Sequence, residues 1–377
     1  MRFVGMKNVT FNNVLTIKNG KNQKQVEKPN GRYPIYGSGG IMGYADDYIC
    51  SEDTVVIGRK GNINKPLYVD EPFWNVDTAF GLEADRSVLL PKYLYYYCLR
   101  FDFERLNKAV TIPSLTKADL LKIEMDLPDL DIQEEIADRL GRIECVMSMR
   151  EQELQKLDEL IKARFVEMFG DPITNPHNYR VQTLQQLIDT GFITYHLDGN
   201  HGGDYPRSEE FVDSGVPYIG ANCIVNGEID FSIAKHLTEE RAGRLRKGIA
   251  HNEDVLFAHN ATVGPTVVLH TELPKVILST SLTAYRCNQD LIKPNYLKAY
   301  MQSEGFVRQY SGEMKQTTRN QVPITAQKKY KFLVPPLEEQ EQFASFVEQV
   351  DKSKVAIQKS LDETQVLFDS LMQQYFG

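Results

Sequence analysis

The sequence lacks the marks of a membrane or secreted protein. None of its apolar runs approaches the roughly 18–20 residues that a transmembrane helix needs, and its beginning, MRFVGMKNVT, lacks the basic and then apolar pattern of a secretory signal. Its five cysteines are scattered and odd in number, which favours free thiols over a disulfide framework. We therefore expect a protein of the reducing cytoplasm, with two or more domains in its 377 residues.

Several motifs of catalysis are missing as well. No G-x-x-x-x-G-K-[ST] phosphate loop occurs, and the glycines at 37–40 are not part of a G-x-G-x-x-G pattern. Asn175-Pro-His-Asn178 lacks the second proline and the aromatic residue of an adenine methyltransferase tetrad, so we interpret it as a turn. Pro128-Asp129 is not followed by the acidic-x-Lys element of a nuclease, and no histidine has a cysteine at zinc-ligand spacing. The sequence predicts neither catalysis nor a metal or cofactor in this chain.

What the sequence does contain is a duplicated segment. Residues 127–170 align without a gap with residues 334–377. Identical matches along the alignment include Pro128 with Pro335, Leu130 with Leu337, Gln133 with Gln340, Leu154 with Leu361, Phe169 with Phe376 and Gly170 with Gly377. Such self-similarity indicates a duplicated half-molecule.

Each copy is predicted to be a long helix that begins after its proline. Apolar residues recur at alternating spacings of four and three in both copies, which is typical of a heptad seam. The first helix leads from residues 1–126 to residues 171–333. A second helix packed along the first must run back, so we expect an antiparallel coiled coil.

The two intervening segments repeat one mixed α/β pattern. Tyr33-Pro-Ile-Tyr36 corresponds to the run Val216-Pro-Tyr-Ile219, and a helix opening at Pro91 corresponds to one opening at Pro294. The contents of the loops differ almost completely, which suits two similar modules that recognise different things. The acidic excess of the chain, with its net charge of −8, lies in the two helices, whereas both modules are close to neutral.

This ordered set resembles the specificity (S) subunits of type I restriction-modification systems. The resemblance rests on four features: Leu127-Pro-x-Leu-x-x-Gln133, Val334-Pro-Pro-Leu-x-x-Gln340, the Phe-Gly helix endings, and Asp198-Gly-Asn-His-Gly202. It implies an α+β chain with target recognition domains at 1–126 and 171–333, spacer helices at 127–170 and 334–377, and pseudo-twofold internal duplication. Each domain would read one half of a bipartite, asymmetric site in double-stranded DNA, while the helices set the spacing.

The resemblance also implies partners. The helices would dock two N6-adenine methyltransferase (M) subunits, and restriction (R) subunits would join the larger complex, which acts in phage defence. S-adenosylmethionine, ATP and Mg would be bound by those partners, while this chain would bind no cofactor. A coiled-coil assembly adaptor, whose modules bind protein rather than DNA, remains the alternative interpretation.

Polar loop residues are the candidates for DNA contacts, because amide and guanidinium groups pair with base edges and lysines mostly hold phosphates. In the first module they are Lys18, Lys21, Lys24, Arg59, Lys60, Asn62 and Lys65. In the second they are Asn200, His201, Arg207, His259, Asn260 and the run Lys315, Gln316, Thr317, Thr318, Arg319 and Asn320, which we favour most. The alternative for each of them is a solvated loop.

The helices carry apolar residues outside the heptad seam, and these are candidates for a subunit interface. They are Val146, Leu160, Phe165, Phe169, Phe346, Val355, Leu367 and Phe376. Two paired helices cannot bury so wide an apolar stripe alone, which favours partner subunits.

Overall fold

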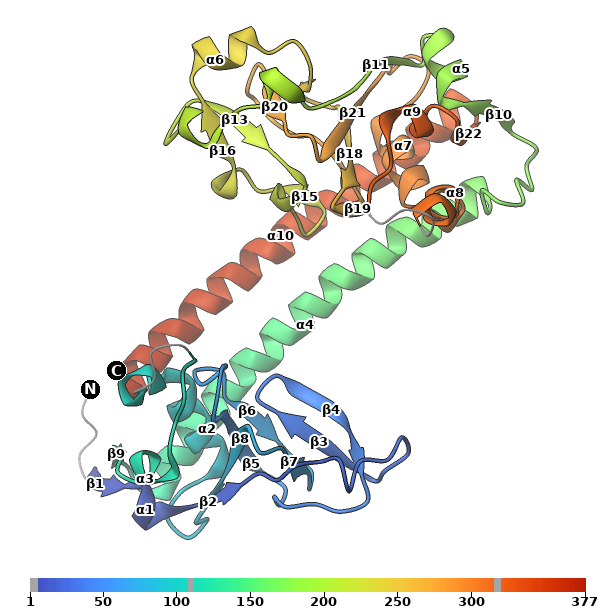
Figure 1. The fold of residues 1–377 in the computed structure, drawn as a ribbon. Coiled ribbons are helices and arrows are strands. Elements are labelled where there is room, and N and C mark those ends of the chain that lie inside the picture. Colours follow the sequence, from blue (N-terminus) through green and yellow to red (C-terminus); the bar gives the residue numbers. More distant parts are fainter. Residues whose placement is uncertain (1–5, 108–111, 315–319) are drawn as a thin grey trace. The chain divides into compact units, whose positions relative to one another are not determined.

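The computed structural model describes residues 6–107, 112–314 and 320–377, which divide between two compact units (Figure 1). Unit 1 comprises Met1–Gln152 and Gln358–Gly377, and unit 2 comprises Glu153–Ile357. Two helices of 40 residues, α4 (Leu130–Phe169) and α10 (Leu337–Phe376), belong to both units. The predicted pair of long helices is confirmed, and each unit holds the beginning of one helix and the end of the other.

Unit 1 is built on a four-stranded antiparallel sheet in the order β2-β8-β5-β6 and a three-stranded sheet in the order β4-β3-β7. The strands are β1 (Lys7–Thr10), β2 (Leu15–Asn19), β3 (Tyr33–Gly37), β4 (Gly40–Ala45), β5 (Thr54–Gly58), β6 (Leu67–Val69), β7 (Trp74–Asn75), β8 (Ala79–Ala84) and β9 (Glu124–Leu127). Short helices are α1 (Phe11–Val14), α2 (Pro91–Arg100), α3 (Lys117–Leu120) and a 3-10 turn (Phe103–Leu106). Strand β1 pairs with β9 just before α4 begins.

Unit 2 contains a four-stranded antiparallel sheet in the order β11-β21-β18-β19 and a five-stranded sheet in the order β12-β16-β13-β20-β17. The strands are β10 (Arg180–Thr183), β11 (Ile193–Asp198), β12 (Phe211–Val212), β13 (Val216–Ile219), β14 (Ile224–Val225), β15 (Glu228–Ile229), β16 (Lys235–Leu237), β17 (Ile249–Ala250), β18 (Val255–Asn260), β19 (Thr262–Val268), β20 (Val276–Leu278), β21 (Leu282–Cys287) and β22 (Lys331–Val334). The helices are α5 (Leu184–Asp189), α6 (Glu239–Arg244), α7 (Pro294–Gln302), α8 (Glu304–Met314) and α9 (Ile324–Gln327), with 3-10 turns at Gly202–Asp204, Ser208–Glu210, Ala221–Cys223 and Phe231–Ile233.

The two units repeat one order of elements, which confirms the predicted duplication. Strands β3 and β7 pair in parallel in unit 1, and so do their counterparts β13 and β20 in unit 2. Helices α2 and α7 both begin at a proline, where the missing N–H costs nothing. Thr116 is the N-cap of α3, since its Oγ1 accepts the backbone N–H of Asp119 at 3.1 Å.

The ends of the long helices complete the hydrophobic cores. In unit 1, Ile136 and Leu140 from the beginning of α4 share a core with Met372 from the end of α10. In unit 2, Phe169 from the end of α4 packs against Phe343 from the beginning of α10, with ring centroids 5.5 Å apart. Since beginnings meet ends in both units, the helices are antiparallel, as predicted.

A buried glutamine fixes the beginning of each long helix. In α4, Gln133 is 0% exposed; its Nε2 donates to Pro128 O (2.8 Å) and Val88 O (2.9 Å), while its Oε1 accepts the N–H of Leu90 (2.9 Å). In α10, Gln340 makes the matching contacts to the backbone ahead of α7 and to Pro335. The amide thus ties each helix to the loop ahead of α2 or α7, which explains why this glutamine recurs in the duplicated segment.

Replacing Gln133 with alanine should leave one buried backbone donor and two buried acceptors without partners. We expect unit 1 to lose at least about 3 kcal/mol of unfolding free energy, because each of the three unmet groups costs roughly 1–3 kcal/mol. Urea unfolding followed by the fluorescence of Trp74, the single tryptophan, measures it. Gln152→Ala, at an exposed position of the same helix, is the matched control and should change little. Equal stability of the two variants would contradict the role of Gln133.

Candidate nucleic-acid interface

In unit 1, the end of β5 continues into a loop at residues 59–61 that pairs with residues 113–115. Lys60 forms a β-bridge with Ser114, Gly61 N–H donates to Pro113 O at 3.0 Å, and Leu115 N–H donates to Arg59 O at 2.9 Å. Gly61 has a φ of 79°, in the left-handed region that glycine adopts at little cost. This pairing holds the loop against a second part of the chain.

Unit 2 has an equivalent segment at residues 259–261, called loop 259–261 here, which comprises the end of β18 and its tight turn into β19 and is paired with residues 320–322. Asn260 forms a β-bridge with Gln321, Ala261 N–H donates to Asn320 O at 2.9 Å, and Val322 N–H donates to His259 O at 2.8 Å. Ala261 is left-handed like its counterpart, with a φ of 65°. Arg59-Lys60 and His259-Asn260, two candidate runs with unlike residues, therefore occupy equivalent positions in the two units.

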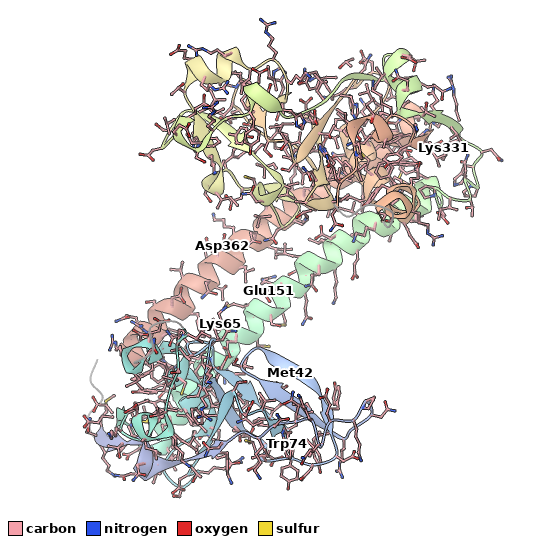
Figure 2. All side chains as sticks on the ribbon, viewed as in Figure 1. Met42, Lys65, Trp74, Glu151, Lys331 and Asp362 are labelled. Carbon is pink, nitrogen blue, oxygen red and sulfur yellow. The ribbon has the colours of Figure 1, made fainter. Side chains whose placement is uncertain are left out.

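The candidates of unit 1 gather near one end of its four-stranded sheet. Arg59 follows β5 and Lys21 follows β2, the two strands that pair with β8. Both contact the segment just before β8, because Arg59 N–H donates to Thr78 O (2.8 Å) and Lys21 N–H donates to Asn75 O (2.9 Å). Arg59, Lys60, Asn62 and Lys65 (Figure 2) are exposed on the β5–β6 connection, and Lys21 and Lys24 are exposed after β2. Lys18 is half-buried and forms an ion pair with Glu83 at 3.4 Å.

Two candidates of unit 2 are buried, which corrects their assignment as direct DNA contacts. Asn200 is 3% exposed and donates to Lys247 O at 2.6 Å, and His259 is 1% exposed with its Nδ1 2.5 Å from Thr283 Oγ1. Each side chain makes its hydrogen bond inside the unit.

The remaining candidates of unit 2 are accessible or lie outside the described residues. His201 is exposed and pairs with Asp198 (2.7 Å), Arg207 and Asn320 are exposed, and Asn260 is half-buried. Lys315, Gln316, Thr317, Thr318 and Arg319 lie outside the described residues.

Sequence reasoning missed an apolar pair beside the unit 1 loop. Ile41 and Met42 follow the turn between β3 and β4 and are 52% and 60% exposed. The turn lies against the end of β5, because a Cβ atom added at Gly58 would be 3.1 Å from Ser38 Cβ. The available signal was the Gly39-Gly40 pair, typical of a turn, followed directly by two apolar residues.

The helix candidates divide into exposed and buried groups. Val146, Leu160, Val355 and Leu367 are 38%, 47%, 65% and 50% exposed, as a partner surface requires. Phe165 and Phe169 are buried in the core of unit 2, and Phe346 and Phe376 are partly buried against the cores. Phe165 and Phe169 complete the core of unit 2, which corrects their assignment to a subunit interface, whereas the assignment of the partly buried Phe346 and Phe376 stays a prediction. The sequence reasoning missed Met149, Val166 and Val366, which are exposed.

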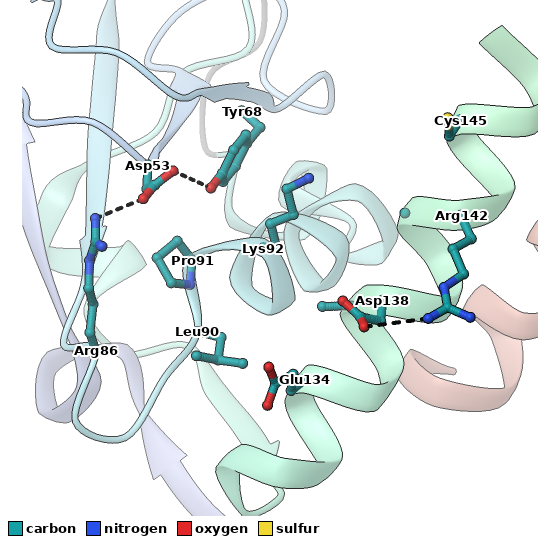
Figure 3. A pocket seen from close by; sticks show the side chains of 12 residues that line it. Asp53, Tyr68, Arg86, Leu90, Pro91, Lys92, Glu134, Asp138, Arg142 and Cys145 are labelled. Carbon is teal, nitrogen blue, oxygen red and sulfur yellow. Dashed lines mark hydrogen bonds and ion pairs between the residues drawn. The ribbon is translucent and has the colours of Figure 1, made fainter. Parts of the chain in front are cut away.

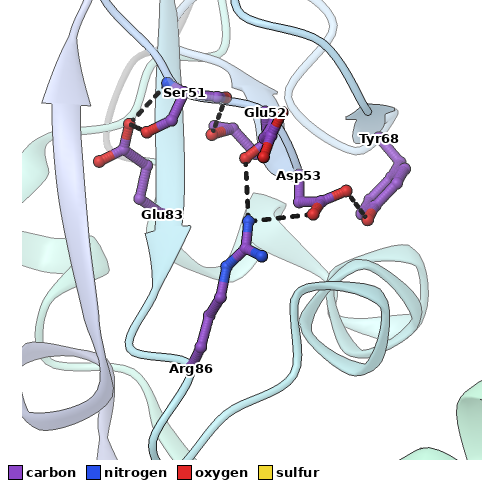
Figure 4. Close-up of polar contacts among 7 residues, drawn as sticks. Ser51, Glu52, Asp53, Tyr68, Glu83 and Arg86 are labelled. Carbon is purple, nitrogen blue, oxygen red and sulfur yellow. Dashed lines mark hydrogen bonds and ion pairs between the residues drawn. The ribbon is translucent and has the colours of Figure 1, made fainter.

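Unit 1 also has a crevice of about 500 Å³ between α2 and α4, where half of the lining residues are charged (Figure 3). At its rim Asp53, with a left-handed φ of 58°, accepts hydrogen bonds from Tyr68 Oη (2.6 Å) and Arg86 (3.0 Å) (Figure 4). Burial, followed by the hydrogen bond to Asp53, raises the pKa of Tyr68, so the phenol stays a donor. Arg86 thus forms an ion pair with Asp53, and Arg142 lies 3.9 Å from Asp138 on the other side of the crevice.

The described residues contain neither a cluster of metal ligands nor a membrane-spanning helix. No group of three or more His, Cys, Asp or Glu side chains that could hold a metal ion occurs in the described part of the chain. Among helices within residues 6–107, 112–314 and 320–377, none is both long and apolar enough to span a bilayer.

The core of unit 2 contains a buried histidine, His196 on β11. Its Nε2 lies 3.1 Å from Gln327 Oε1, and its Nδ1 has no hydrogen-bond partner among the described residues. Burial lowers the pKa of His196 from 6.5 to about 4, and burial also lowers the pKa of His259 nearby. The protonated form would carry an N–H on Nδ1 that no described group accepts, so the ring is neutral at pH 7.

Unit 2 should therefore lose stability as the pH falls from 6.5 toward 4. A pKa lowered in the folded state means that the unfolded chain binds the proton first, which costs about 3 kcal/mol by pH 4 from His196 alone. Hydrogen exchange of β11 and β21 amides against pH measures it. The stability difference between the native chain and His196→Phe should be constant above pH 7 and change toward pH 4. A difference that is constant at every pH would contradict the assignment.

Comparisons with known proteins agree with this architecture. The family model for the type I restriction modification DNA specificity domain matches residues 4–159 and 195–364. The specificity subunit of the type I restriction enzyme MjaVIII from Methanocaldococcus jannaschii is 20% identical over 323 residues, which cover 81% of this chain and 74% of that one. The EcoBI specificity subunit from Escherichia coli is 18% identical over 364 residues, which cover 91% and 75%.

Solved structures show the same fold. The S subunit of a type I restriction-modification system from M. genitalium matches with a TM-score of 0.62 at 18% identity, over 100% of this chain and 97% of that one. A chain from work on complex assembly and conformational transition of the type I R-M system matches with a TM-score of 0.55 at 16% identity, over 99% and 98%.

A duplicated α+β chain, with a divergent loop at equivalent positions of two units and helices shared between them, defines a two-domain recognition subunit. The family match extends over most of the sequence, so this chain belongs to the type I restriction modification DNA specificity family. It is a DNA sequence-recognition subunit of a type I restriction-modification system. The family and function predicted from the sequence are confirmed, and the adaptor alternative is not favoured.

Proposed function

We propose that unit 1 and unit 2 each read one half of a bipartite, asymmetric site in double-stranded DNA. The observation that carries the proposal is the pair of equivalent loops with unlike residues, Arg59-Lys60-Gly61 and His259-Asn260-Ala261. A common backbone pairing presents different groups, which is what reading two different half-sites requires.

The chemistry of the accessible groups differs between the two loops. Arg59 offers a planar fork that suits O6 and N7 of guanine, and its neighbour Lys60 suits phosphate. Asn260 and Asn320 offer amides, which suit N6 and N7 of adenine. The backbone contact between Ala261 and Asn320 brings these two asparagines to the same edge of unit 2.

The long helices would dock two methyltransferase (M) subunits, and restriction (R) subunits would join them. Support comes from the exposed apolar residues of α4 and α10, which occur in both units: Val146 and Leu367 in unit 1, Leu160 and Val355 in unit 2. The partners would bind S-adenosylmethionine, ATP and Mg, methylate adenine at N6 and cleave DNA, while the helices of this chain set the distance between half-sites.

Single substitutions in the equivalent loops should affect different half-sites. In the complex with its methyltransferase subunits, Arg59→Ala should weaken recognition at one or more positions of one half-site, and Asn260→Ala at positions of the other. Each loss should be about 1–3 kcal/mol, or roughly 5- to 150-fold, if a base contact is removed. Methylation rates on duplexes that carry single base changes measure it, and each variant is the control for the other. An equal loss on all sequences would reduce the residue to a phosphate contact, and no loss would remove it from the interface.

A charge placed on the exposed apolar positions should weaken assembly. Leu367→Asp in unit 1 and Val355→Asp in unit 2 each place a carboxylate where an apolar partner surface would desolvate it, at a cost of several kcal/mol. We expect at least a tenfold rise in the dissociation constant for the methyltransferase subunit, measured by light scattering and titration. Ser370→Asp, at an exposed polar position of α10, should bind normally. Full assembly of both Leu367→Asp and Val355→Asp would show that partners dock elsewhere.

A further inference from the structure

The cores beneath the two equivalent loops differ in chemistry. In unit 1, Ile17 and Leu82 pair across β2 and β8, and Phe80 pairs with Ile57 on β5. In unit 2, the same register places His196 opposite Tyr285, and Thr283 opposite Phe257. Leu120 of α3 lies five residues after Leu115, and Gln327 of α9 lies five residues after Val322. Leu115 and Val322 are the residues whose N–H groups donate to Arg59 O and His259 O, so Leu120 and Gln327 are equivalent. Four buried apolar side chains of unit 1 are thus replaced by four buried polar ones: His196, Thr283, Tyr285 and Gln327.

Gln327, which is 0% exposed, is the centre of the polar cluster. Its Oε1 accepts hydrogen bonds from Tyr285 Oη (2.5 Å) and His196 Nε2 (3.1 Å). Its Nε2 donates to Thr283 Oγ1 and to Val322 O, both at 3.2 Å. Both polar atoms of its amide are therefore used, and they join α9 to three other parts of the unit: β11, β21 and segment 320–322.

Two of these contacts lead directly to the loop. Thr283 Oγ1 also shares a hydrogen bond with His259 Nδ1 (2.5 Å), and Val322 N–H donates to His259 O (2.8 Å). The amide of Gln327 thus holds the first residue of loop 259–261 through its side chain and through its backbone partner. Unit 1 has the same backbone bond, from Leu115 N–H to Arg59 O (2.9 Å), but its Arg59 side chain is exposed, with the guanidinium 5.8 Å from the ring of Phe80.

A buried polar network stabilises a fold only when each of its polar groups has a hydrogen-bond partner. It then restricts the surrounding structure to one arrangement. An apolar core fills the same place in unit 1, so the fold itself does not require the network. What the network adds in unit 2 is a hydrogen-bonded, buried His259 ring. The ring fixes the start of loop 259–261, which carries Asn260 and pairs with Asn320.

We propose that Gln327 is a positioning residue for DNA recognition by unit 2: its amide orders loop 259–261 and the paired segment 320–322, and so sets which base pairs that unit accepts. The inference rests on the proposed reading of one half-site by each unit. Gln327 touches no DNA in this scheme and acts through His259, Thr283 and Val322.

The test uses the complete complex with its methyltransferase subunits and duplexes that differ at single positions of either half-site. Gln327→Leu introduces the residue that unit 1 has at this position. Thr283→Val removes the shared hydroxyl with almost no change of shape, and Thr283→Ser keeps the hydroxyl. Tyr296→Phe is the stability control, because it removes a buried hydrogen bond to Leu333 O (2.9 Å) elsewhere in unit 2.

We expect Gln327→Leu and Thr283→Val to reduce discrimination at the half-site affected by Asn260→Ala by roughly tenfold or more. Discrimination at the other half-site should be unchanged. Thr283→Ser, which keeps the hydroxyl, should discriminate like the native complex at both half-sites. Tyr296→Phe should lower the melting temperature with no loss of discrimination.

Three outcomes would overturn the positioning role. They are unchanged discrimination in both Gln327→Leu and Thr283→Val, an equal loss at both half-sites, and the same selective loss in Tyr296→Phe. Failure of the proposed function would be visible separately, because the native complex would then show no half-site that depends on unit 2.

Discussion

The structure depends on the mutual completion of the two cores by antiparallel helices. The beginning of α4 and the end of α10 supply Ile136, Leu140 and Met372 to unit 1, while the opposite ends supply Phe169 and Phe343 to unit 2. Burial of large apolar side chains is the main stabilising term in folding, so neither unit has a complete core without both helices. The same requirement fixes the direction of the chain and explains why recognition loops can change freely around a constant frame.

The helices and the duplication could be predicted from the sequence because their signals are local. The heptad pattern, repeated with a proline and a glutamine at matched places, indicates two similar helices from the sequence alone. The structure adds the role of Gln133 and Gln340, which bind the backbone around the start of each helix. The candidate site was less predictable, because burial depends on strand register and on packing between distant residues. Asn200 and His259 read as polar loop residues, yet both are buried, and Phe165 and Phe169 close a core instead of facing a partner.

The equivalence of the two loops also could not be predicted from residue identity. Arg59 and His259 share a backbone position but differ in charge, size and exposure, and the backbone pairing with residues 113–115 and 320–322 reveals the correspondence. A duplicated frame can therefore diverge in two layers, first in the exposed loop residues and then in the core beneath them. The polar cluster around Gln327 is an example of the second layer, which single-residue comparison of surfaces would overlook.

The division of unit 1 between distant parts of the chain has a consequence for biosynthesis. Phe376, in the last turn of α10, packs against Tyr93 with ring centroids 5.2 Å apart, and Met372 is buried in the same core. Residues 153–357 must leave the ribosome before these side chains appear. The N-terminal domain, which usually folds first during synthesis, here stays unfinished until translation reaches α10. A premature stop within α10 would damage the core of the first-made domain as well as shorten the helix.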